Sequence, residues 1–181
     1  MGGLKIIMLL CIIEKNINQY DCFWRENMKY VTATSDMIDS IYDVLHTGIK
    51  TIYPKYYPKE VVEFFCQHYS KEHILDGIAS GNMGVLADGN RIIGTGCFDC
   101  NHITGVYVLP SHQRQGYGTQ IMNCLESEIS KKYDIAILDA SLPAVCLYEH
   151  RGYKTVGHGI YELENEVKLV YEIMEKKLRT N

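Results

Sequence analysis

Residues 106–119 (Val-Tyr-Val-Leu-Pro-Ser-His-Gln-Arg-Gln-Gly-Tyr-Gly-Thr) hold the residue types best suited to chemistry in this chain. An apolar run rich in β-formers ends at Pro110, whose nitrogen cannot donate to a sheet ladder. The chain is therefore expected to leave its neighbouring strand at this point. Backbone N–H groups freed in this way can pair with a linear ligand that itself carries amides. The segment predicts a strand end that binds an extended, amide-bearing molecule.

Two glycines, Gly116 and Gly118, follow at the start of an expected helix. Glycine lets the backbone approach an anion, successive N–H groups form a concave nest, and the helix N-terminus adds a favourable dipole. A P-loop needs Gly-Lys-Ser/Thr, which is absent, and Ile121 stands where a dinucleotide-binding fingerprint has its third glycine. Two interpretations stay open: an anion cradle with Arg114 as an added cation, or a tight turn into a helix.

The whole pattern V-x-P-x-x-Q-x-x-G-x-G-T resembles the acetyl-CoA motif of the GCN5-related N-acetyltransferase (GNAT) superfamily. Residues 138–153 are similar to the same family's strand followed by N-x-x-A-x-x-L-Y-x-x-x-G-[FY], with Ser141 in place of the Asn. The strand and helix order expected for residues 28–176 fits the family. The resemblance implies a single-domain α/β fold with a mixed, mostly antiparallel central sheet flanked by helices. Splayed central strands of that sheet are implied to bind acyl-CoA.

The resemblance also implies roles for individual residues. The backbones of Val106, Tyr107 and Val108 pair with the pantetheine arm, and the Val108 amide polarises the thioester carbonyl. Tyr148 contacts the cosubstrate as the general acid that protonates the departing CoA thiolate. Ser141 replaces an Asn that hydrogen-bonds pantetheine. The implied pyrophosphate cradle consists of Gln113, Arg114, Gln115, Gly116, Tyr117, Gly118 and Thr119.

A proton acceptor is needed as well, because a lysine-like amine has a pKa near ~10.4 and must lose a proton before it attacks. On the expected central strand only His102 titrates close to neutral pH. Strict period-two alternation puts His102 on one face with Val106 and Val108, and Tyr107 on the other. His102 is therefore the predicted base, and proton loss to bulk water through an open cleft is the alternative.

Hydrophobic periodicity predicts the elements that must position these residues. A strand over 29–34 is followed by a helix with Ser35 as its N-cap, and Pro-containing residues 53–58 break that helix before a second one begins at Pro58. After Gly81 the period changes from helical to two. The expected later elements are a short helix at 73–78, strands at 83–87, 91–98 and 102–108, a helix at 118–132, a strand at 135–139, a helix at 143–151, and strands at 153–163 and 167–176.

Length and composition bound the class of protein. The chain has 181 residues, of which 46% are hydrophobic and 22% charged, which fits one globular domain. A formal net charge of −4 disfavours a nucleic-acid partner. The apolar run at residues 6–13 is far shorter than the roughly 20 residues that span a bilayer, and no small-x-small cleavage site follows it. No membrane partner is predicted.

We expect residues 1–27 to form an N-terminal extension to a domain over 28–181, packed on that domain or against a second subunit of a homodimer.

The seven cysteines are odd in number and scattered over the chain, which favours reduced thiols in the cytoplasm. The one close pair, Cys97 and Cys100, has no second pair or HxxxH to complete a metal site, so no metal is predicted.

The sequence thus predicts an acetyltransferase that moves an acetyl group from acetyl-CoA to the primary amine of a small molecule or peptide. The predicted mechanism is direct attack in a ternary complex. The alternative is a non-catalytic acyl-CoA-binding or sensing module with the same fold. Tyr148 distinguishes the two, because a protein that only binds acyl-CoA has no need of a hydroxyl there.

Overall fold

A single seven-stranded sheet forms the centre of the computed structural model, which describes residues 28–163 and 166–178. The predicted extension, residues 1–27, lies outside the described residues. The sheet has the order β1-β2-β3-β4-β5-β7-β6, and every neighbouring pair is antiparallel except β4 and β5. Its strands are β1 (Met28–Thr32), β2 (Met83–Asp88), β3 (Arg91–Asp99), β4 (His102–Val108), β5 (Ile135–Ser141), β6 (Lys154–Glu162) and β7 (Lys168–Lys177). The expected mixed, mostly antiparallel sheet is confirmed.

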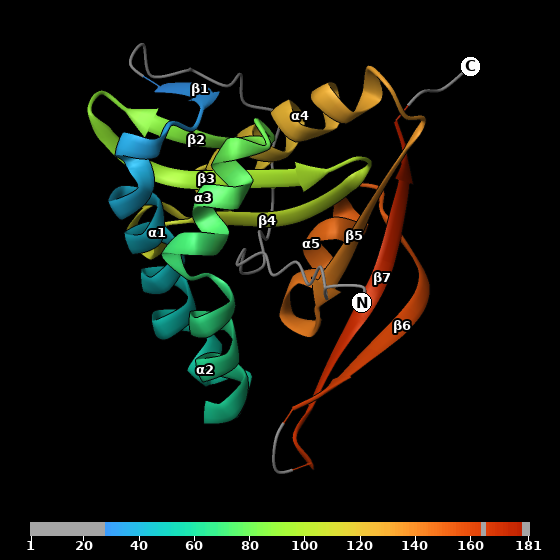
Figure 1. Cartoon of the computed structure of the whole chain (residues 1–181). Coiled ribbons are helices and arrows are strands. Elements are labelled where there is room, and N and C mark those ends of the chain that lie inside the picture. Colours follow the sequence, from blue (N-terminus) through green and yellow to red (C-terminus); the bar gives the residue numbers. More distant parts are fainter. Residues whose placement is uncertain (1–27, 164–165, 179–181) are drawn as a thin grey trace.

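Helices cover both faces of the sheet (Figure 1). One face carries α1 (Ile38–Ile52), α2 (Lys59–His68) and α3 (Lys71–Ala79), and the other carries α4 (Tyr117–Ser130) and α5 (Val145–His150). Each layer encloses its own apolar core. Ile41, Phe65 and Tyr107 belong to the core under α1–α3, whereas Val106 and Ile121 belong to the core under α4 and α5.

Element boundaries follow local sequence closely, and the clearest difference lies at the first helix. The predicted N-cap Ser35 instead opens a 3-10 turn, Ser35–Met37, and α1 begins only at Ile38. The Met37 N–H donates to the Thr34 carbonyl at 2.9 Å, which closes that tighter turn first. Pro58 lies at the N-cap of α2, one residue before its predicted position. The N-cap prediction for Ser35 was wrong, and the helix itself is confirmed.

The two parallel strands pair over only a short distance. The β4–β5 ladder contains His102 with Ile137 and Ile103 with Leu138, although both strands continue beyond these pairs. Figure 1 shows β5 diverging from β4, toward the projecting β6–β7 hairpin. The later residues of β4 thus have β3 on one side and no β5 ladder on the other. This divergence, called the splay below, agrees with the splayed central strands that the resemblance implies, but it begins after Ile103, well before Pro110.

A β-bulge changes which face His102 occupies. In the β3–β4 ladder Cys97 pairs with Gly105 and Phe98 with Ile103, so Thr104 is an extra residue on β4. Ile103 and Val106 consequently share the core under α4 and α5, although they are three residues apart. His102 therefore points to the α1–α3 face, the face of Tyr107. Its predicted placement with Val106 and Val108 was wrong, because a bulge reverses the alternation of every residue that precedes it.

Two glycines let α4 lie close on β3. A Cβ built on Gly96 would lie 2.5 Å from Ile121 Cγ2 and 3.0 Å from Leu125 Cδ1, and one on Gly94 would lie 2.8 Å from Ile121 Cδ1. Side chains of α4 thus contact the strand backbone directly. The start of α4, which carries the predicted anion cradle, is thereby held at a fixed height above the sheet.

Gly96→Ala is expected to destabilise the fold, because a methyl group there overlaps a β-branched side chain with little freedom to move. Overpacking of this kind costs about 1–3 kcal/mol. We expect a Tm lower by roughly 2–10 °C in a thermal melt. Gly157→Ala on β6 is the matched control, since its nearest neighbour would be 3.8 Å away and its Tm should not fall. Equal melting temperatures for Gly96→Ala and the parent would show that α4 can move away from β3 without loss of stability.

Candidate functional site

Backbone groups of β4 face the splay at Val106 and Val108. The Leu109 N–H donates to the Ile93 carbonyl at 2.8 Å, so Val108 and Gly94 form a non-hydrogen-bonded pair, and so do Val106 and Gly96 two positions away. In such pairs the N–H and C=O groups point away from the partner strand. Here they point toward β5, which no longer pairs at this level. The predicted vacancy for an amide-bearing ligand thus lies at the position where β4 and β5 diverge.

The loop after β4 is folded back on the strand end. Gln113 Nε2 donates to the Val108 carbonyl at 3.0 Å, so this side chain ties the loop to the end of β4. Arg114 has φ of 60° and Gly116 has φ of 82°, both in the left-handed region. Alternating hands of this kind make a nest of N–H groups, and Gly116 adopts its conformation without the steric penalty of a side chain.

The nest leads directly into α4, whose N-cap is Gly116. The first N–H groups of any α-helix lack an intrahelical acceptor, and no capping side chain binds them here. Gly118 is buried in that first turn, while Thr119 and Arg114 are exposed. The structure therefore brings together an anion-attracting helix end, a nest and a cation within residues 114–119.

Tyr148 lies on the short helix α5 and is fully buried. Its ring packs edge-on against Tyr153, with centroids 5.6 Å apart. Its phenol also contributes to the raised pKa of Tyr53, whose main cause is burial. The Tyr148 and Tyr53 hydroxyls are therefore close enough to interact electrostatically, although α5 and the turn that contains Tyr53 cover opposite faces of the sheet.

An ion cluster around Glu126 holds α5 against α4. The Glu126 carboxylate contacts Arg151 Nε at 2.8 Å and Lys176 Nζ at 2.9 Å, and it accepts a hydrogen bond from the Tyr153 hydroxyl at 3.1 Å. All four groups are largely buried, which strengthens each contact and makes the loss of any one costly. The cluster fixes the ring of Tyr153 and thereby the wall behind Tyr148.

A chain of tyrosine hydroxyls supports β4 from the α1–α3 face. The hydroxyls of Tyr53 and Tyr107 lie 2.9 Å apart, and the Tyr69 hydroxyl donates to the carbonyl of Thr104 at 3.2 Å. Burial raises the pKa of Tyr107 and of Tyr53 well above the ordinary tyrosine range, so both stay protonated. The network holds the bulge at Thr104 and with it the direction of the Val106 N–H.

Tyr57 and Ser141 close the far side of the splay. Tyr57 comes from the turn between α1 and α2, and Ser141 is the last residue of β5 and is buried. The two hydroxyls come near one another without a hydrogen bond of ordinary geometry. Burial raises the pKa of Tyr57, and the Ser141 hydroxyl partly offsets that rise. The α1–α2 turn thus reaches across toward β5, and the expected pantetheine contact at Ser141 lies beneath it.

His102 is paired across the sheet with an acid that the sequence did not single out. His102 Nε2 lies 3.6 Å from Asp139 Oδ2, with side-chain exposures of 22% and 10%. Burial raises the pKa of Asp139 to about 6. The signal that pointed to Asp139 was present in the sequence: it is the only charged residue in the otherwise apolar and small strand 135–141.

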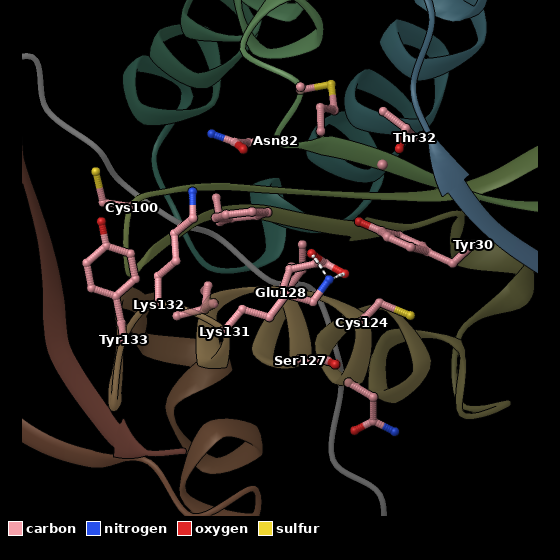
Figure 2. A pocket seen from close by; sticks show the side chains of 17 residues that line it. Tyr30, Thr32, Asn82, Cys100, Cys124, Ser127, Glu128, Lys131, Lys132 and Tyr133 are labelled. Atoms are coloured by element: carbon pink, nitrogen blue, oxygen red, sulfur yellow. Dashed lines mark hydrogen bonds and ion pairs between the residues drawn. The ribbon is translucent and has the colours of Figure 1, made fainter. Parts of the chain in front are cut away.

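A groove with a volume of about 640 Å³ lies elsewhere, between the C-terminal half of α4 and the β1–β2 edge (Figure 2). The groove is lined by Tyr30, Cys124 and Lys132, and Cys100 lies beside Tyr133 at one end.

Within residues 28–163 and 166–178, no three His, Cys, Asp or Glu side chains converge as a metal site would require. In the same part of the chain no helix is both long and apolar enough to cross a bilayer.

The predicted site residues are thus placed in two groups by the structure. Around the splay and the loop beyond it lie Val106, Tyr107, Val108, Gln113, Arg114, Gln115, Gly116, Tyr117, Gly118, Thr119, Ser141 and Tyr148. His102 lies apart from these, at the closed end of the splay where the parallel ladder forms. Tyr69 and Asp139 were missed, because their importance depends on contacts distant in sequence.

Comparison with known proteins agrees with this geometry. A family model described as an acetyltransferase (GNAT) domain matches residues 52–170. Among curated proteins, none matches the chain. A GCN5-related N-acetyltransferase structure from Rhodopseudomonas palustris superposes with a TM-score of 0.75 at 18% identity, over 84% of this chain and 96% of that one.

Two further solved structures show the same fold. PaiA N-acetyltransferase from Thermoplasma acidophilum, in complex with coenzyme A, gives a TM-score of 0.64 at 18% identity, over 83% of this chain and 98% of its own. The ribosomal-protein-S18-alanine N-acetyltransferase from Escherichia coli gives 0.63 at 14% identity, over 85% and 96%. At such identities the likeness concerns the fold alone, but the family model covers well over half of the chain. The chain belongs to the GNAT acetyltransferase family.

Proposed function

We propose that this protein is an N-acetyltransferase that transfers an acetyl group from acetyl-CoA to a primary amine by direct attack in a ternary complex. The observation that carries the proposal is the β4–β5 splay with the Val106 and Val108 N–H groups directed into it, followed at once by the nest and helix start at residues 114–119. An extended amide chain ending in a pyrophosphate fits that sequence of donors.

The order of these groups sets the direction of the pantetheine arm. The cradle lies beyond the C-terminal end of β4, so an arm that enters from the cradle meets Val108 before Val106. The thioester, at the far end of the arm, then lies at the Val106 N–H, one pairing position deeper than the sequence suggested. A single preorganised N–H donor there stabilises the charge that develops on the thioester oxygen.

The remaining groups supply proton transfer. The acceptor ammonium gives one proton to His102, and its nitrogen then forms a bond to the thioester carbon. The carbon–sulfur bond breaks, and the sulfur takes the proton of the Tyr148 hydroxyl. The second proton of the amine nitrogen restores Tyr148, and His102 passes its proton to water. Burial raises the pKa of the neighbouring Tyr53 and Tyr107 phenols well above the ordinary tyrosine range, so those two groups are weak proton donors.

Small-molecule and peptide amines both fit an open splay reached from the α1–α2 turn. Because the seven cysteines are odd in number and scattered over the chain, a reducing compartment such as the cytoplasm is the proposed location. We also propose a homodimer in which residues 1–27 contact the second subunit.

A non-catalytic acyl-CoA-binding module is the second candidate function. It is favoured by the fact that the cradle and the splay would suffice for binding and by themselves require no turnover.

The deciding experiment is acetyl-CoA turnover with a panel of a diamine, an aromatic monoamine, free lysine and a peptide with a free N-terminus. Release of the CoA thiol is followed by absorbance and the acetylated amine by mass spectrometry. Amine-dependent thiol release supports the transferase. Tight CoA binding by calorimetry with no acetylated product from any amine supports the binding module.

A further inference from the structure

An imidazole and a carboxylate from different strands meet at the closed end of the splay. His102 begins β4 and pairs with Ile137 in the short parallel ladder, and Asp139 lies two residues further along β5. The distance of 3.6 Å between His102 Nε2 and Asp139 Oδ2 is too long for a good hydrogen bond and short enough for an ion pair.

Both side chains point to the same face of the sheet. Leu138 and Ala140 lie in the core under α4 and α5, so Asp139, between them, points to the α1–α3 face. The bulge at Thr104 turns His102 to that face as well. Without the bulge the two groups would lie on opposite faces. Both retain some solvent exposure, so protons can reach them and leave.

The pair also lies in line with the proposed path of the thioester. An arm that passes Val108 and then Val106 runs toward the vertex of the splay, where the ladder begins. The amine attacks at the end of that arm, from the face on which the α1–α2 turn and Tyr107 lie. A proton acceptor at the vertex, on that face, is placed ahead of the reacting carbon.

We infer that Asp139 is a positioning residue that orients His102 across the vertex of the splay and stabilises its protonated form, so that His102 accepts the proton of the acceptor amine. The inference rests on the proposed function and assigns a partner to its base. One proton moves from the amine nitrogen to the His102 imidazole, and no bond other than N–H breaks in this step. The imidazolium that results faces the Asp139 carboxylate through Nε2–H.

Other ionisable groups share this face. Asp99 lies opposite His102 on β3, and Glu175 and Tyr171 lie on β7 beside Ile137 and Ser141. Asp139 contributes to the raised pKa of Tyr171, after burial. From the helix layer, Tyr69 and His73 border a small cavity of about 30 Å³ with Thr104. The surroundings are mainly acidic, which favours an ammonium acceptor and the protonated imidazole alike.

The first test titrates the ring of His102 by NMR in the full chain, and needs no acceptor. Asp139→Asn keeps the shape and removes the charge, so the midpoint of the His102 titration should fall by about one pH unit. Glu172→Gln is the matched control: Glu172 is the ladder partner of Ala140, but its side chain lies on the other face. A midpoint that is the same in the parent and in Asp139→Asn would overturn the pairing.

The second test follows kcat/KM against pH for whichever amine of the panel is acetylated. Asp139→Asn should lower the plateau roughly tenfold to a hundredfold and move the acidic limb to lower pH, while His102→Gln should abolish that limb. An unmoved limb in Asp139→Asn, with only a lower Tm, would leave Asp139 a structural residue and refute the inference. If the parent acetylates no amine, the proposed function fails, and with it the proton transfer, while the titration still decides the pairing.

Discussion

Gly118→Val should lose most of its affinity for CoA. Gly118 is buried in the first turn of α4, between the nest at Gly116 and exposed Thr119. A β-branched side chain there fills the space through which a phosphate approaches the backbone N–H groups. Each hydrogen bond to a charged group contributes about 1.5–3 kcal/mol. Loss of even one predicts a Kd roughly tenfold to more than a hundredfold higher, measured by titration calorimetry.

Two further variants keep this result interpretable. Gly118→Ala is smaller and should fold where Val does not, with an intermediate loss of affinity. Ser127→Val places the same β-branched residue at an exposed position of the same helix, so it controls for helix propensity and should bind CoA like the parent. A folded Gly118→Val protein with unchanged affinity for CoA would remove the cradle from residues 114–119.

Tyr148→Phe should lower kcat by about a hundredfold and leave KM for acetyl-CoA nearly unchanged. Positioned acid catalysis is typically worth roughly 10²–10⁴-fold. The lower end applies here, because the leaving thiolate is already a fairly stable anion with a pKa near ~8.5. Tyr148 is fully buried, so its hydroxyl delivers a proton where bulk water does not readily replace it. Steady-state kinetics with chemistry shown to be rate-limiting measures the effect.

Tyr153→Phe is the matched control for this variant. Its ring packs against Tyr148, and its hydroxyl donates to Glu126. Removing that hydroxyl leaves the buried Glu126 carboxylate with one donor fewer, which should lower the Tm without lowering kcat comparably. If both variants reduced kcat to the same extent, Tyr148 would be a packing residue, and the non-catalytic binding module would gain support.

The loop and helix start proposed to bind the cosubstrate were predictable from sequence because their parts are local. Pro110 ends a strand, Gly116 adopts a left-handed φ, and a helix begins one residue later, all within a short segment. Short-range constraints of this kind depend on residue type and not on distant contacts. The same is true of the order of strands and helices, whose periods of two and 3.6 are visible along the chain.

The face of His102 was not predictable, because a bulge has no reliable mark in the sequence. Alternation counted from Val108 gave the wrong face, since Thr104 adds one residue to β4. That extra residue is held by the Tyr69 hydroxyl on the Thr104 carbonyl, a contact between residues 35 apart in sequence. The bulge therefore depends on packing of α3 and its N-terminal flank on β4, and the decision belongs to the tertiary structure.

The partner of Asp139 was likewise not predictable from sequence. Sequence alone marks it as a carboxyl in an apolar strand, a position that is costly without a partner. It does not say that the partner is His102, because that contact depends on the parallel pairing of β4 with β5 and on the bulge together. The sequence by itself determined the family, the element order and the glycine-containing turn into α4, through motif spacing, local sterics and hydrophobic period. Only the tertiary structure decided which face each acid and base occupies, because sheet register and packing between distant segments set that choice.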